Sequence, residues 1–205
     1  MAARNLPIPE IAHPITIGAG FAASPAGIVV GHGDTVNFTN NSGSDITIQF
    51  LPNSPGQALY PAMSLFVQSG TTNGFTVPNT DCAANYNVTV NGVVQSADPF
   101  VIQVGNGPMY VLITGSLQAP YFEPGTVAVP LGNITTGLGR LQMQSQVPNA
   151  VFPINFSSNP FNPGITQSGP AQPVKAGTTP GSYGYSGTNG IRERAGGGTV
   201  IIRSA

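Results

Sequence analysis

Charged side chains are unusually scarce in this sequence of 205 residues. Only 6% of the residues are Asp, Glu, Lys or Arg, against about 25% in a typical soluble protein. Disordered chains usually combine high charge with low hydrophobicity, whereas 40% of this chain is hydrophobic. We therefore expect a folded protein with a polar, largely uncharged surface. Because the formal net charge is −1, electrostatic repulsion would do little to oppose self-association.

The basic residues are too few and too scattered for a nucleic-acid-binding surface. Such surfaces neutralise phosphates with a patch or stripe of Lys and Arg. The only cluster here is Arg192 and Arg194, and Glu193 lies between them. The sequence therefore predicts no nucleic-acid partner. The six basic residues are Arg4, Arg140, Lys175, Arg192, Arg194 and Arg203.

Cysteine is also scarce, since Cys82 is the only one. An intrachain disulfide is thereby excluded, although pairing with a cysteine of another chain stays open. The neighbouring Asp81 would raise the pKa of the thiol, which disfavours a reactive thiolate. We expect Cys82 to be a buried, unreactive side chain.

Long apolar segments are missing as well. No run of 18 apolar residues predicts a transmembrane helix. The first residues lack the apolar region of a secretory signal peptide. The compartment is thus left undetermined, although the uncharged composition favours the cell surface or the extracellular space.

The residues that are present alternate between apolar and polar, which is the spacing of β-strands. Helical spacing does not persist for three turns anywhere in the chain. Turn residues separate the alternating segments, and Asn91-Gly92 predicts a tight hairpin. Segments about 8–12 residues apart are typical of a sandwich or barrel. In the first half the expected strands are 28–30, 35–39, 45–50, 75–77, 86–90 and 100–104.

This order of strand and turn segments occurs twice along the chain. Residues 46–50 read Ile-Thr-Ile-Gln-Phe, and 152–156 read Phe-Pro-Ile-Asn-Phe, so that Phe156 follows Phe50 by 106 residues. The later segments Val-Gln-Ser-Gly-Thr-Thr and Val-Lys-Ala-Gly-Thr-Thr place Gly177 107 residues after Gly70. The nearly constant offset predicts a duplicated all-β domain, since about 100 residues suffice for a small sandwich.

We therefore expect two tandem Greek-key β-sandwiches preceded by an extended N-terminal arm. The arm is rich in proline, which fixes φ and removes hydrogen-bond donors. Its short run Ile15-Thr-Ile17 could add one strand to a sheet edge, and exchange of the arm between subunits stays open. The expected boundaries are 1–24 for the arm, 25–104 for the first sandwich, 105–119 for a linker strand and 120–205 for the second sandwich.

The strand sequences resemble those of cupredoxins, the blue-copper fold. Gly33–Asn41 followed by Ile46–Phe50 resembles the early strands, and Asp98–Val104 resembles the closing strand. In the second copy, Gly181–Ser186 looks like the strand that leads into the copper-binding loop, and Gly198–Arg203 again resembles the closing strand. The resemblance covers most of the first copy and, more faintly, the second. It lies in strand patterns, so it implies the fold.

The copper ligands that this resemblance would imply are missing from both copies. A blue-copper centre needs two His, one Cys and usually a weak axial Met. The position of the first His is occupied by Ile46 and by Phe152, and the position of the Cys lies near Val90 and at Gly187. We therefore expect no metal and no cofactor.

Other catalytic constellations are not visible either. His32 and Asp34, two residues apart in a turn, are too few to form a metal site or to define a general base. Only one further histidine, His13, is available for a catalytic triad. The seven acidic residues are scattered singly, without the pairing that glycoside hydrolysis requires. The sequence therefore predicts a protein that is not an enzyme.

Three functions remain open. The leading hypothesis is a structural subunit of a filament, surface layer, shell or larger complex, as a homo-oligomer or with other proteins. The alternative is a binding module that recognises a glycan or a protein through loops 51–65 and 157–173. Its aromatic contacts would be Tyr60, Phe66 and Phe161. A third possibility is an electron carrier or enzyme that uses Cys82 with His32.

Overall fold

A computed structural model describes residues 10–51, 59, 62–117, 119–133, 137–187 and 197–204. Over these residues the chain forms β-strands and one short 3-10 helix, as the alternating sequence predicts. The elements of the first half are β1 Ala12–Ile17, η1 Ala19–Phe21, β2 Ala23–Ser24, β3 Gly27–Val30, β4 Thr35–Asn40, β5 Ile46–Phe50, β6 Ser64–Val67, β7 Thr72–Thr76, β8 Cys82–Val90, β9 Val93–Val94 and β10 Phe100–Val104. Those of the second half are β11 Met109–Ser116, β12 Ala119–Glu123, β13 Thr126–Pro130, β14 Gly132–Asn133, β15 Gly137–Leu138, β16 Arg140–Ser145, β17 Ile154–Phe156, β18 Gln172–Pro173, β19 Gly181–Gly187 and β20 Gly197–Arg203.

The first half is a sandwich of two sheets. One sheet has the strand order β2-β1-β4-β7, and the other has the order β3-β10-β8-β5-β6, with β9 paired to the end of β8. Alternate residues of each strand point into the space between the sheets. In β4, for example, Val36 and Phe38 are completely buried while their neighbours are half-buried. These inward faces form one hydrophobic core.

The second half repeats most of this architecture, although β6 and β9 have no counterpart among its described strands and the small β14-β15 ribbon is added. Its sheets have the orders β12-β11-β16-β18 and β13-β20-β19-β17. The unusual features recur as well, because β1 and β4 pair in parallel, as do β11 and β16. The closing strands β10 and β20 likewise run parallel to β3 and β13. The prediction of an all-β chain is thereby confirmed, and its sheets follow the same order of strands in both halves.

The two copies also share a turn that the sequence singled out. In the first copy the backbone N–H and the hydroxyl of Thr71 both donate to the Gln68 carbonyl, at 3.1 and 2.8 Å. In the second copy Thr178 donates twice to the Lys175 carbonyl, at 3.1 and 2.7 Å. The glycine that precedes each threonine has a positive φ, 73° and 79° respectively, which a residue without Cβ adopts at little cost. The turn is therefore built in the same way in both halves.

The structure differs from the predicted N-terminal arm. Residues 12–17 form β1, which lies between β2 and β4, and its side chains Ile15 and Ile17 are completely buried. Burial of two isoleucines stabilises the strand, and Pro14 is tolerated because β2 pairs only with Thr16 and Ile17. The part of the predicted arm from residue 12 to Ser24 thus belongs to the first sandwich. Residues 1–9 lie outside the described part of the chain.

The predicted linker 105–119 also differs from what is observed. Most of it is β11, a strand that pairs with β12 on one side and β16 on the other. Met109, Val111 and Ile113 alternate along β11 and are completely buried in the second core. The same alternation that identifies core strands elsewhere in the sequence therefore places β11 inside the second sandwich.

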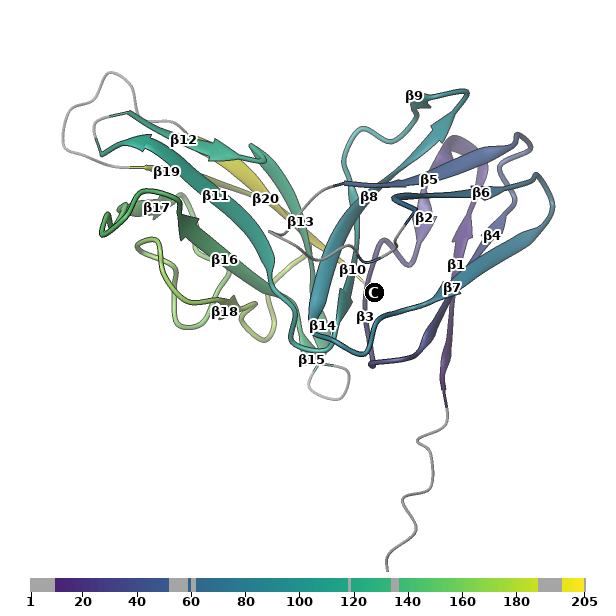
Figure 1. The fold of residues 1–205 in the computed structure, drawn as a ribbon, viewed down its shortest axis with the longest axis horizontal. Helices are drawn as coiled ribbons and strands as arrows, with labels where there is room; N and C mark the ends of the chain where they lie inside the picture. The colour runs from purple at the N-terminus through teal and green to yellow at the C-terminus, as the bar shows by residue number, and fades with distance from the viewer. Residues whose placement is uncertain are drawn as a thin grey trace, which may run out of the picture.

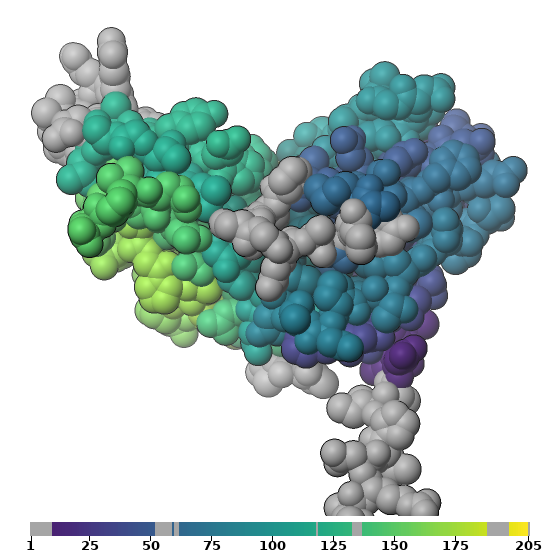
Figure 2. All heavy atoms as spheres, viewed as in Figure 1, coloured from purple at the N-terminus to yellow at the C-terminus, as the bar shows by residue number. Residues whose placement is uncertain are grey.

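The two sandwiches meet through the outer face of β8 and β10. Ala83 and Val101, which point away from the first core, pack into the core of the second sandwich. Figures 1 and 2 show the two halves diverging from this junction like the arms of a V. Ala83 and Val101 are small, so the sheets can approach closely at this point.

Two buried amide side chains connect the halves by hydrogen bonds. Asn85 of β8 accepts from the N–H of Ala128 at 3.0 Å and donates to the carbonyl of the same residue at 2.9 Å. Gln103 of β10 donates to the Leu138 carbonyl at 3.1 Å and accepts from the Arg140 N–H at 3.0 Å. Each amide thus satisfies backbone groups that are brought out of water where the sandwiches meet.

We expect Asn85→Ala to destabilise the whole protein. The substitution leaves the N–H and carbonyl of Ala128 buried without these partners, and each such group costs about 1–3 kcal/mol. The measurement is the free energy of unfolding in urea. The control is Asn87→Ala on the same face of β8, where the side chain is only half-buried. Equal stability of the Asn85 and Asn87 variants would contradict the role of the Asn85 amide.

Candidate functional site

The positions where the cupredoxin resemblance would place copper ligands are filled by packing residues. Ile46 and Phe152 are buried in the two hydrophobic cores. Val90 is half-buried, and Gly187 is buried at the end of β19. A Cβ added at Gly187 would lie 2.7 Å from Pro120 Cγ, so that even an alanine would force the neighbours to shift. None of these four residues offers a side-chain donor, so they do not fit a copper ion.

Metal-binding residues do not gather elsewhere in the part of the chain that the structure describes. No three His, Cys, Asp or Glu side chains come together there as a group that could hold a metal ion. Cys82 is buried in the first sandwich. Burial, and secondarily the charge of Asp81, raises the pKa of its thiol to about 11. At neutral pH the thiol therefore stays protonated and weakly nucleophilic.

Both histidines lie against carboxylates, but not in the pairing suggested by their sequence neighbours. Asp34 does not pair with the nearby His32. Its Oδ2 lies 2.7 Å from Nε2 of His13 on β1. His32 instead places its Nε2 2.8 Å from Oδ1 of Asp81, a residue 49 positions further along the chain. His32 and Asp34, which are close in the sequence, thus belong to two separate pairs, each with a more distant residue.

These pairs join several loops at one end of the first sandwich. Asp34 also accepts from the backbone N–H of Ile11 at 3.1 Å and of Gly31 at 2.8 Å. Asp81 accepts from the N–H of Asn106, at 3.1 Å, in the segment that leads into the second sandwich. Within the described residues the histidines therefore connect β1, the turn before β4 and the junction segment. Their role is structural.

The hydrogen bonds also change the acidity of both carboxylates. Burial alone would raise the pKa of Asp34, but the bonds from His13, Ile11 and Gly31 outweigh it, so the pKa lies below its usual value of 3.8. The pKa of Asp81 is lowered chiefly by the Asn106 N–H, against an opposing effect of burial.

The three aromatic residues proposed as ligand contacts occupy different positions in relation to the structure. Phe66 lies on β6 with 56% of its surface exposed, so it is available to a partner. Phe161 is only 3% exposed and packs edge-on against Phe156, with ring centroids 5.8 Å apart. Phe161 is thus a core residue, and the prediction that it contacts a ligand is not supported by its position. Tyr60 lies outside the described residues.

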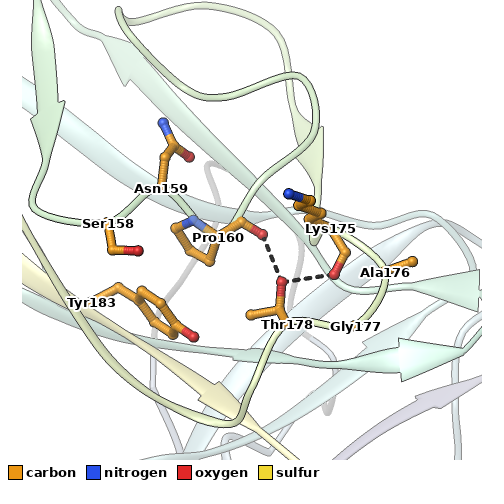
Figure 3. Close-up of a pocket in the computed structure, with 8 residues that line it drawn as sticks. All are labelled: Ser158, Asn159, Pro160, Lys175, Ala176, Gly177, Thr178 and Tyr183. Atoms are coloured by element: carbon orange, nitrogen blue, oxygen red, sulfur yellow. Dashed lines mark hydrogen bonds between the residues drawn. The ribbon is translucent and has the colours of Figure 1, made fainter.

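A cleft does open beside the predicted loop 157–173. Its volume is about 200 Å³, and it is lined by Ser158, Asn159, Pro160, Lys175, Ala176, Gly177, Thr178 and Tyr183. Figure 3 shows the Ser158 hydroxyl and the Tyr183 ring on one side of Pro160, and Lys175 with Ala176 on the other. The Tyr183 hydroxyl donates to the Thr179 carbonyl at 2.6 Å, which fixes the ring in the wall.

The walls of this cleft are held by the repeated turn. Thr178 Oγ1 lies 2.7 Å from the Lys175 carbonyl and 3.3 Å from the Pro160 carbonyl (Figure 3). The sequence predicted that loop 157–173 would border a binding site, but Phe161, the contact residue that it predicted there, is buried. Lys175 and Tyr183 come from beyond the loop, and only the fold brings them to it. Lys175 lies in the repeated Val-Lys-Ala-Gly-Thr-Thr segment and Tyr183 in the strand Gly181–Ser186, but neither pattern marks them as residues of a cleft.

We expect the stability of the protein to fall in acid because of Asp34. A lowered pKa means that Asp34 stabilises the fold fully above its unfolded-state pKa of about 3.8. This contribution is lost as the pH falls through the folded-state pKa. Asp34→Asn should lower the free energy of unfolding at pH 7 by about 1–3 kcal/mol and flatten its dependence on pH below about 4. The control is Glu123→Gln, which changes an exposed carboxylate on β12. If the free energy of unfolding depends on pH in the same way for wild type and Asp34→Asn, the role of Asp34 is contradicted.

No family model and no curated protein matches the chain. Several solved structures do resemble it, at low identity. A multicopper oxidase is 13% identical, with 93% of this chain and 88% of that chain covered and a TM-score of 0.36. A purple cupredoxin from Nitrosopumilus maritimus is 18% identical over 45% of this chain and 98% of its own, with a TM-score of 0.33. A copper-containing nitrite reductase from Thermus scotoductus SA-01 is 14% identical, with coverages of 96% and 62% and a TM-score of 0.37. These neighbours are cupredoxin-like proteins, the class that the strand sequences resemble, and at TM-scores below 0.5 the likeness carries no argument about the function of this chain.

Proposed function

We propose that this protein is a non-enzymatic structural subunit that assembles with further copies of itself. The observation that carries the proposal is a pair of uncharged sheet edges on the first sandwich. Among the described residues, β6 pairs only with β5, and β7 pairs only with β4. The two edge strands lie in contact with one another in the first sandwich (Figure 1). One side of the sandwich therefore presents both sheet edges.

The sequences of these strands do not protect the edges. Natural proteins discourage edge-to-edge pairing with lysine, proline or inward-pointing charge. β6 reads Ser-Leu-Phe-Val and β7 reads Thr-Asn-Gly-Phe-Thr, with none of these devices. Phe66 extends from β6 into solvent, while its carbonyl accepts from Asn73 Nδ2 at 2.8 Å. A strand from a second copy would extend the sheet and cover the exposed ring.

Several of the charged side chains in the described part of the chain are used inside the fold. Asp34 and Asp81 bind the histidines. Asp45 accepts from the Ser69 N–H at 2.8 Å, and Arg203 donates to the Pro99 carbonyl at 2.9 and 3.1 Å. Together with the net charge of −1, this arrangement leaves little electrostatic repulsion between copies. It supports assembly through neutral surfaces.

We expect the wild-type protein to be oligomeric in light scattering at micromolar concentration. Phe66→Lys should shift the population toward the monomer, because a lysine on an edge strand opposes pairing with another strand. Gln49→Lys is the matched control, since Gln49 is also exposed but lies on β5, where it pairs with Ser64 of β6 and Asn87 of β8.

A monomeric wild-type protein would contradict the proposal, as would equal effects of the two lysine substitutions. A truncation that tests the N-terminal residues should remove only 1–9. Removal of 1–24 would delete β1 and β2 and expose part of the first core.

A second candidate function is a binding module that recognises a glycan or protein through loops 51–65 and 157–173. The cleft in Figure 3 favours it on the side of loop 157–173. Lys175 supplies a positive charge there, and Ser158 and Asn159 supply neutral hydrogen-bonding groups. A ligand with acidic groups, such as a uronic-acid oligosaccharide or an acidic peptide, would complement this lining.

For this second candidate we expect acidic oligosaccharides or acidic peptides to perturb the backbone amide resonances around Ser158 and Thr178. Lys175→Ala should weaken binding by about tenfold, the loss of about 1.4 kcal/mol, and leave the light-scattering profile unchanged. Phe66→Lys is the reciprocal variant, because it should change the light-scattering profile and leave the binding of acidic ligands unchanged. If no acidic ligand perturbs these resonances, or if Lys175→Ala binds like the wild type, the cleft is not the site.

A further inference from the structure

A larger cavity lies where three distant segments meet. It has a volume of about 390 Å³, within the usual range of roughly 300–1,000 Å³ for ligand sites. One wall is the turn of η1 with Phe21, another is the segment 95–98 that precedes β10, and the third is Arg203 at the end of β20. Because Arg203 belongs to the second sandwich, the cavity is complete only when both halves are joined.

Phe21 is held in the cavity wall in a strained conformation. Its φ is 61°, and the preceding Gly20 has a φ of 78°. Positive φ is uncommon for an aromatic residue and costs about 1–3 kcal/mol. The turn is closed by hydrogen bonds from the Phe21 N–H to the Gly18 carbonyl at 3.0 Å and from the Gly18 N–H to the Ala22 carbonyl at 3.1 Å. Strain of this kind persists where surrounding structure enforces it, and it is concentrated at binding sites.

The hydroxyl of Ser96 lines the same cavity without an internal partner. Its Oγ is buried and makes no hydrogen bond to any of the described residues. A buried hydroxyl that lacks a partner costs about 1–3 kcal/mol.

Arg203 and Asp98 add a fixed pair of opposite charges. The Arg203 guanidinium is held by two bonds to the Pro99 carbonyl and lies 5.5 Å from the centroid of the Phe100 ring. Its Nη2 is 3.8 Å from Asp98 Oδ2. The Asp98 side chain is 50% exposed and that of Arg203 21% exposed, so both charges remain accessible to a small ligand.

We propose that this cavity binds a neutral carbohydrate, as one sugar unit of a glycan. The guanidinium donates hydrogen bonds and the carboxylate accepts them, which matches the mixed donors and acceptors of sugar hydroxyls. The Phe21 ring provides an apolar surface for the C–H face of a sugar ring. A simple anion would meet Asp98, and a simple cation would meet Arg203, so the paired charges favour a neutral ligand.

This site goes beyond the structural role and lies apart from the edge strands β6 and β7. It would attach an assembled subunit to a glycan-bearing surface, while assembly itself proceeds through other residues. Its ligand also differs from the acidic one expected at the cleft of Figure 3. Failure of one proposal therefore leaves the others standing.

The experiment is a titration of the full-length protein with neutral monosaccharides, followed by backbone amide resonances in NMR. Glucose, mannose, galactose and N-acetylglucosamine are the probes, with acetate and methylammonium as charged comparators. We expect at least one sugar to shift the amides of Phe21, Ala97 and Asp98 with a Kd in the millimolar range, and we expect neither charged comparator to do so.

Two variants test the chemistry of the site. Asp98→Asn preserves the shape of an exposed side chain and should fold. Phe21→Gly relieves the positive φ but removes a ring that packs against the first core, so its fold is checked by the positions of the amide resonances far from the cavity. Each should weaken sugar binding at least tenfold, while Glu123→Gln on β12 should bind like the wild type. The proposal is overturned if no sugar shifts these amides, if acetate or methylammonium shifts them instead, or if both variants bind sugar as tightly as the wild type.

Discussion

The structure depends on the junction at which the amide of Asn85 hydrogen-bonds to both backbone groups of Ala128. Without the second sandwich, the outer face of β8 and β10 would be exposed to water. Ala83 and Val101 lie on this face and pack into the second core. Gln103 repeats the arrangement on the neighbouring strand. Neutral amides suit this place because they satisfy a donor and an acceptor together without the cost of burying a charge. The cavity at Arg203 exists because this junction holds the two halves together.

The duplication extends to the aromatic packing within each core. Phe50 is paired across the sheet with Tyr86, and Phe156 with Tyr185. Both tyrosines are buried, burial raises the pKa of each hydroxyl, and neither hydroxyl has a partner among the described residues. The same aromatic pair thus stabilises each sandwich. The positions that correspond to copper ligands are apolar in both copies, so what the two halves share is a packed scaffold.

Because charged residues are scarce, those that make internal contacts leave few for the surface of the protein. Asp34 and Asp81, together with the two histidines, hold loops at one end of the first sandwich. Asp98 and Arg203 meet at the cavity between the halves. Few charges then remain for the sheet edges, and β6 and β7 present neutral side chains. A surface of this kind is compatible with repeated packing and with neutral, hydrogen-bonding ligands.

The sequence by itself determined central strands such as β4, β5 and β10, the Asn91-Gly92 hairpin between β8 and β9, and the duplication, because alternation and turn chemistry are local properties. It also showed that residues such as Ile46 and Gly187 provide no metal donors. Tertiary structure alone decided that His13 rather than His32 meets Asp34, that β1 and β11 are core strands, and that Phe161 is buried. Tertiary structure also brings Phe21, Ser96 and Arg203 together as walls of one cavity. These outcomes depend on which faces pack together across 20 to 180 residues, and no local pattern encodes that choice.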